Sequence, residues 1–151
     1  MKVILLQWLL FTFYTTYVWI KYGVQKSISE SWYTMGKSEN WMFTVVFCWG
    51  IGVSMFFYDS IWFVVGGSFL TFVGAATSFK DRWDTTRYVH NIGASGCITL
   101  ALAGLAVEGI WWPAVAMVAG SYLLLKVDNR TWWIETLAVY VILGGLFQRY
   151  L

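Results

Sequence analysis

Six apolar runs divide this chain, and they constrain its fold more than any other feature of the sequence. The runs cover residues 3–20, 41–58, 61–79, 92–107, 110–125 and 132–147. A helix of roughly 17–25 apolar residues crosses the hydrocarbon core of a bilayer, so the first and third runs suffice by themselves. The shorter runs need flanking Trp, Tyr or Thr residues to reach the full thickness of the membrane. A small hydrophobic mismatch costs little free energy, so short spans are tolerated. We therefore expect an all-α, polytopic transmembrane helix bundle with six spans.

Composition predicts a single domain. Of the 151 residues, 59% are hydrophobic and 12% are charged, so residues 1–151 are expected to form one transmembrane domain. Five spans plus a re-entrant segment at 110–125 form the alternative architecture. Cys48 and Cys97 lie inside apolar runs, which favours buried free thiols and leaves a disulfide between them as the alternative.

The basic residues predict which way the bundle faces. When the runs are threaded up and down, eight of the ten Lys and Arg residues fall in or beside the loops on one side. They are Lys21, Lys26, Lys37, Lys80, Arg82, Arg87, Lys126 and Arg130. Lys and Arg near short loops are retained in the cytoplasm. We therefore expect an integral protein of the cytoplasmic or inner membrane, with both termini outside.

Most other polar side chains are expected on the same, cytoplasmic side. Residues 27–30 (SISE) have the form of a capping box, in which the Ser and Glu side chains bond each other's backbone N–H groups. Such a box predicts a short helix with Ile28, Trp32 and Met35 on one face, lying in the membrane interface. Glu135 lies one turn into the last run, and an ionisable residue inside a span is a functional candidate. Pairing with a basic residue of the inner loops is the structural alternative for Glu135.

His90 is the only histidine of the chain and the main candidate for catalysis. A single His can act as a general base, and Asp84 and Glu135 are the other candidate catalytic residues. An interfacial His that bonds a loop carbonyl explains the same residue without catalysis. No ligand spacing supports a metal site built on His90 and two carboxylates. No metal and no other cofactor is therefore predicted, although a bound lipid is compatible with the pattern.

Two segments resemble patterns in small prokaryotic membrane proteins. They are SISESWY at 27–33 and, after Phe79-Lys80-Asp81, His90 leading into a Gly/Ala-rich helix. Those proteins are distantly similar to the CREST superfamily of membrane hydrolases and receptors. The resemblance implies a multi-helix bundle and, in the enzymes of the superfamily, a zinc ion held by several histidines with Ser and Asp nearby. Ser29, Asp84 and His90 would be the remnants of that site. Because this chain has one His, the resemblance extends to the bundle and not to the zinc site.

The leading hypothesis for function is a non-catalytic helix bundle that binds a membrane lipid or a partner through its cytoplasmic face. A lipid phosphate would find basic side chains and helix N-termini there. The expected contact residues are Ser29, Glu30, Lys37, Arg82, Arg87, Lys126 and Arg130. The net charge of +2 gives no reason to expect nucleic-acid binding.

Two other functions remain open at this point. Small residues recur every fourth position at Gly67, Thr71 and Ala75, and again in the next run at 93, 97 and 101. Such stripes allow close helix packing, either within one chain or in a homo-oligomer. An oligomeric channel or small transporter is therefore one alternative, and a membrane-embedded, hydrolase-like enzyme that uses His90 is the other.

Overall fold

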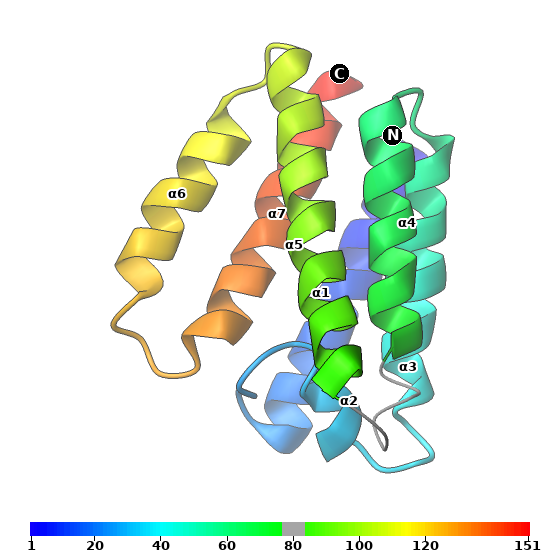
Figure 1. Ribbon diagram of the computed structural model, residues 1–151, viewed down its shortest axis with the longest axis vertical. Helices are drawn as coiled ribbons and strands as arrows, with labels where there is room; N and C mark the ends of the chain where they lie inside the picture. Colours follow the sequence, from blue (N-terminus) through cyan, green and yellow to red (C-terminus); the bar gives the residue numbers. More distant parts are fainter. Residues whose placement is uncertain (77–83) are drawn as a thin grey trace.

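Every regular element that the structure describes is a helix (Figure 1), which confirms the all-helical fold. This computed structural model describes residues 1–76 and 84–151, without the side chains of residues 76 and 84–87. In chain order the elements are α1 (Lys2–Tyr22), α2 (Ser31–Thr34), α3 (Trp41–Thr44), η1 (Val45–Gly52), η2 (Val53–Phe57), α4 (Ile61–Ala76), α5 (Asp84–Val107), α6 (Trp112–Leu124) and α7 (Arg130–Arg149).

The longer helices run side by side, and their connections gather at two opposite ends of the bundle (Figure 1). The terminal end holds both chain termini and the turns at 58–60 and 108–111. There Arg149 forms an ion pair of 2.5 Å with Glu108 and donates a hydrogen bond of 3.1 Å to the carbonyl of Asp59. The loop end holds the connections at 23–40 and 125–129. This alternation agrees with the up-and-down order expected from the apolar runs.

Two helices are long and apolar enough to cross a membrane by length and composition, namely Lys2–Tyr22 and Tyr88–Val107. Three further apolar helices are shorter, namely Trp41–Phe57, Ile61–Ala75 and Trp112–Leu124. With 13 residues, α6 is about 20 Å long, whereas the hydrocarbon core is about 30 Å thick. The helix at the fifth run is thus shorter than the expected 110–125, and six complete spans stay a prediction.

The second apolar run is not the single regular helix expected at 41–58. Its middle part, η1, is a π-helix and is followed by the 3-10 helix η2. The Ser54 hydroxyl donates to the carbonyls of Gly50 and Ile51, at 2.6 and 2.8 Å. Such bonds to the preceding turn compete with the helical ladder, and here they lie next to the irregular segment.

The small-residue stripes are used for packing inside the chain. The most extensive helix–helix interface joins α4 and α5 within one chain, a choice that the stripes alone left open, and a Cβ atom at Gly93 would lie 3.0 Å from the Phe69 carbonyl oxygen. Gly67 faces η1 instead, since its Cβ would lie 2.5 Å from the Gly52 carbonyl oxygen. Both faces are therefore occupied within one chain, and a homo-oligomer stays a prediction. Cys48 and Cys97 are buried free thiols.

Large apolar side chains cover the outside of the bundle as well as its core. On α1 and α6, Leu9, Ile20, Val118 and Leu123 are between 69% and 80% exposed. Helices that are apolar on all sides belong either in a protein core or in a membrane. These side chains lie outside the core, so the surface favours a membrane environment.

Candidate functional site

A pocket lies inside the bundle between α1, η1, η2, α4, α5 and α7. Its cavity volume is about 80 Å³, several times the roughly 15 Å³ that one water molecule needs. Its apolar lining consists of Ile28, Phe43, Phe47, Ile51, Met55, Leu70, Val73, Ala94, Cys97, Ile98, Ala101, Val139, Ile142, Leu143 and Leu146. Four polar residues complete it, namely Gln7, Ser29, His90 and Glu135.

The spacing of the lining residues follows the helical repeat. They occupy positions 90, 94, 97, 98 and 101 of α5 and positions 135, 139, 142, 143 and 146 of α7. Residues three and four apart share one face of a helix, so each helix presents a single stripe to the cavity. In both helices the first member of the stripe is ionisable and the others are apolar or, at Cys97, weakly polar. The sequence thus places one polar residue at the loop end of each stripe.

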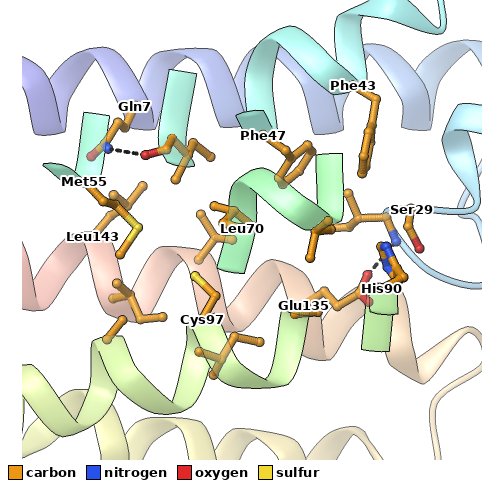
Figure 2. Close-up of a pocket in the computed structure, with 18 of the residues that line it drawn as sticks. Gln7, Ser29, Phe43, Phe47, Met55, Leu70, His90, Cys97, Glu135 and Leu143 are labelled. Carbon is orange, nitrogen blue, oxygen red and sulfur yellow. Dashed lines mark hydrogen bonds between the residues drawn. The ribbon is translucent and has the colours of Figure 1, made fainter. Parts of the chain in front are cut away.

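The polar lining residues lie at opposite ends of the pocket (Figure 2). Ser29, His90 and Glu135 are together at the loop end, beside Phe43. Gln7 lies at the other end, near Met55 and Leu143. The pocket therefore has an apolar middle and two polar ends with different chemistry.

Glu135 bonds the turn that precedes α2. The Ile28 N–H donates to Glu135 Oε2 at 2.6 Å, and the Ile28 carbonyl accepts a hydrogen bond from the Ser31 hydroxyl. Ser31 in turn is 2.5 Å from the Tyr14 hydroxyl. Among the residues described, neither Lys126 nor Arg130 pairs with Glu135. A backbone hydrogen bond thus holds this carboxylate among the described residues, and the expected pairing with Arg87 falls on a side chain outside them.

The capping-box pattern is present in part, but the segment lies differently from the expectation. The Ser27 hydroxyl accepts a hydrogen bond of 3.2 Å from the Glu30 N–H, while α2 itself begins only at Ser31. Ile28 and Met35 are buried in the core of the bundle and do not lie on a membrane surface. The reason is that their apolar side chains close the loop end of the bundle.

The structure brings two of the three candidate catalytic residues together. His90 and Glu135 line the same end of the pocket, and the His90 ring is hydrogen bonded to the backbone of Val73. Val73 lies in α4 and not in a loop, so a bond to a loop carbonyl, the structural alternative given for His90, stays a prediction. The side chain of Asp84 lies outside the described residues. Within the described part of the chain, no three His, Cys, Asp or Glu side chains are grouped so as to hold a metal ion.

The expected lipid-contact residues divide among several places. Ser29 is the one that lines the pocket, whereas Lys126 and Arg130 line a shallow surface hollow together with Lys26. Lys37 is exposed between α2 and α3, and Glu30 lies in the turn before α2. Arg82 and the side chain of Arg87 lie outside the described residues.

Gln7 is a polar lining residue that was not among the predicted site residues. It is completely buried, and its Nε2 donates to Ser54 and, at 3.4 Å, to the Ile51 carbonyl. The Tyr58 hydroxyl donates to its Oε1. An amide inside an otherwise apolar run was the available signal, because a buried amide needs partners just as a buried charge does.

A second polar cluster at the loop end was also not predicted. Glu39 accepts hydrogen bonds from Tyr17 and Tyr22, at 2.8 and 2.6 Å, and pairs with Lys21 at 2.5 Å. The ammonium group of Lys21, followed by the two tyrosine hydroxyls, lowers the pKa of Glu39 to about 2. This carboxylate is therefore fully partnered, and it does not line the pocket.

The chain is not placed in a known family by its sequence or by its fold. The similarity to the CREST superfamily stays a prediction that rests on the segments quoted for it. Function must therefore be inferred from the pocket and from the surface of the bundle. No protein-family model, no curated protein and no solved structure matches the chain.

Proposed function

We propose that this chain is an integral membrane protein whose helix bundle binds an amphiphilic lipid in the interior pocket. The observation that carries the proposal is the distribution of polarity along that pocket. Its middle is lined by aliphatic and aromatic side chains, and Ser29, His90 and Glu135 gather at the loop end. Ligand sites combine apolar walls with a few polar groups that orient the ligand. An acyl chain would fill the middle, and its head group would meet the polar end.

The outer surface supports a membrane setting for this site. Apolar side chains are exposed on α1 and α6, and α1 and α5 are long enough to cross a bilayer. A lipid in the surrounding bilayer is present at high local concentration, so a modest affinity suffices for occupancy. The basic hollow formed by Lys26, Lys126 and Arg130 lies at the same end and suits anionic head groups of the inner leaflet. The loop end is accordingly proposed to face the cytoplasm.

The test is to fill the cavity and to measure bound lipid. Ala94 lines the pocket, so Ala94→Leu adds three carbon atoms to its wall. Ala119 is exposed on α6, so Ala119→Leu adds the same atoms outside. Native mass spectrometry of the purified proteins should find a retained amphiphile in the wild type and in Ala119→Leu, and several-fold less in Ala94→Leu. An empty wild-type protein, or equal retention by a folded Ala94→Leu variant, would contradict the proposal.

A membrane hydrolase is the second candidate, and one observation favours it. A hydroxyl, an imidazole and a carboxylate, from Ser29, His90 and Glu135, share one end of a pocket, and these are the groups that nucleophilic catalysis combines. The test is the hydrolysis of p-nitrophenyl dodecanoate by the wild type and by His90→Ala. Activity that is lost in a folded His90→Ala variant would support this function. Wild-type activity no higher than that of buffer would remove it for such esters.

A further inference from the structure

The charge of the preferred head group follows from the surroundings of Glu135. Within the described part of the chain, this residue is the single acid that lines the pocket. Its bonded partner among the described groups is the Ile28 N–H, which contacts Oε2 alone. A carboxylate has about four acceptor sites on its two oxygens. Most of the hydrogen-bonding capacity of Glu135 is therefore unused by the residues that the structure describes.

No basic side chain that the structure describes lines the pocket and balances this carboxylate. Lys21 is paired with Glu39, and Arg149 is paired with Glu108 at the opposite end of the bundle. The other described cations at the loop end are Lys26, Lys126 and Arg130, which line the separate hollow, and Lys37, which is exposed. A carboxylate in apolar surroundings is costly unless it is paired. Among the residues that the structure describes, Glu135 thus has no cationic partner, and a cationic ligand could pair with it.

The neighbouring aromatic rings favour the same kind of ligand. Phe43 and Phe47 both line the pocket, and their ring centroids are 4.6 Å apart. Figure 2 shows Phe43 at the end that holds Ser29 and His90. The face of an aromatic ring attracts cations, most strongly where water is excluded. The polar end of the pocket therefore combines a carboxylate with aromatic walls.

His90 does not oppose a cation at this place. Its ring donates one hydrogen bond to the backbone of Val73. In neutral imidazole the second ring nitrogen is an acceptor, as is the hydroxyl oxygen of Ser29. Both groups can accept hydrogen bonds from an ammonium head group, whereas an anionic head group would face the carboxylate of Glu135.

Building on the proposed function, we propose that the pocket selects single-chain lipophilic amines, with the ammonium group paired to Glu135 beside Phe43. The alkyl chain lies along the apolar middle, and Ser29 and His90 accept the remaining N–H groups. An alcohol of the same chain length can hydrogen bond but brings no charge, so it binds more weakly. A fatty acid binds most weakly, because its carboxylate is repelled by Glu135.

The test compares dodecylamine, dodecanol and dodecanoic acid as ligands of the protein in phosphatidylcholine nanodiscs, whose lipid has no net charge. Because the probes share one chain length, differences in their site occupancy at equal membrane concentration report the head group. Dodecylamine should bind the wild type at least about tenfold more tightly than dodecanol. Glu135→Gln keeps the size and one acceptor, and it should reduce amine affinity by about tenfold or more while leaving dodecanol unchanged.

Matched variants separate the possible failures. Glu39→Gln removes another acid at the loop end, outside the pocket, and should retain the preference for the amine. Equal binding of the three probes to the wild type, or an unchanged preference in Glu135→Gln, overturns the head-group inference and leaves the pocket as a lipid site. Binding of all three probes that Ala94→Leu does not reduce overturns the proposed function itself.

Discussion

Gln7 and Glu135 occupy opposite ends of one pocket, and the protein treats them in opposite ways. Gln7 is bonded on both sides of its amide, to Ser54 and the Ile51 carbonyl through Nε2 and to Tyr58 through Oε1. Glu135 has one backbone donor on one oxygen. We infer that the saturated Gln7 holds the fold together, whereas Glu135, which is only partly bonded among the described residues, is the group proposed to meet a ligand. The comparison separates structure from recognition within a single cavity.

The largest effect is expected from removing the amide at the terminal end. Gln7→Leu leaves the Tyr58 hydroxyl without its amide partner, while the Ser54 hydroxyl keeps its bonds to the carbonyls of Gly50 and Ile51. We expect a loss of about 2 kcal/mol in the free energy of unfolding. The measurement is thermal unfolding in a fixed detergent, followed by tryptophan fluorescence. Gln148 is an exposed amide that accepts from Trp112 at the same end, so Gln148→Leu is the control. Equal melting temperatures for the two variants would break the comparison.

The contrast also shows what the sequence could and could not predict about the site. His90 and Glu135 could be found because ionisable side chains stand out in or beside apolar runs. Gln7 was not predicted, because an uncharged amide in an apolar run stands out less than an ionisable side chain. A buried amide nevertheless needs hydrogen-bond partners too. The bond between Ile28 and Glu135 joins residues 107 positions apart. No local pattern indicates such a contact, so the closing of the pocket by the 27–31 turn appears only in the structure.

The fold was more predictable, since hydropathy by itself marks where apolar helices must lie. The runs at 3–20 and 132–147 correspond closely to α1 and α7. The irregular η1 was not expected, because the apolar run at 41–58 predicts a single regular helix. The short α6 has a local cause that could have been used. Pro113 lies in its first turn and Gly109, with φ +84, in the turn before it, so the helix cannot extend back to residue 110.

A smaller loss is expected at the terminal end outside the pocket. Arg149 is paired with Glu108, donates to the Asp59 carbonyl and lies 5.4 Å from the ring of Phe63. Because these groups are only partly exposed, Arg149→Ala should cost about 1 kcal/mol of stability. Lys2→Ala, at an exposed position of the same end, should cost nothing measurable. An Arg149→Ala variant as stable as wild type would show that the terminal end does not depend on the polar contacts of Arg149.

Glu135→Gln should change the stability of the protein less than Arg149→Ala does, and this sharpens the comparison between Gln7 and Glu135. The amide oxygen still accepts the Ile28 N–H, and an acid with no cationic partner among the described residues is removed, so stability should stay within about 1 kcal/mol of wild type or rise. The measurement is the same thermal unfolding, without added ligand. A loss as large as that of Gln7→Leu would mean that Glu135 is structural as well, and the distinction between the two ends would fail.

The smallest effect concerns Glu39, which tests whether saturation or location decides the role of an acid. Glu39 lies at the loop end like Glu135, but Lys21, Tyr22 and Tyr17 partner it fully and lower its pKa from 4.5 to about 2. A lowered pKa stabilises the fold above the unfolded value and is lost as pH falls through the folded one. The melting temperature of the wild type should therefore exceed that of Glu39→Gln slightly at neutral pH, and the difference should vanish between pH 4.5 and about 2. Because the cluster is solvent-accessible, the difference should also shrink at high salt.

A difference that persists at pH 2 would assign the contribution of Glu39 to its shape and not to its charge. A loss of amine binding in Glu39→Gln would mean that the loop end acts as one unit, whatever the bonding of each acid.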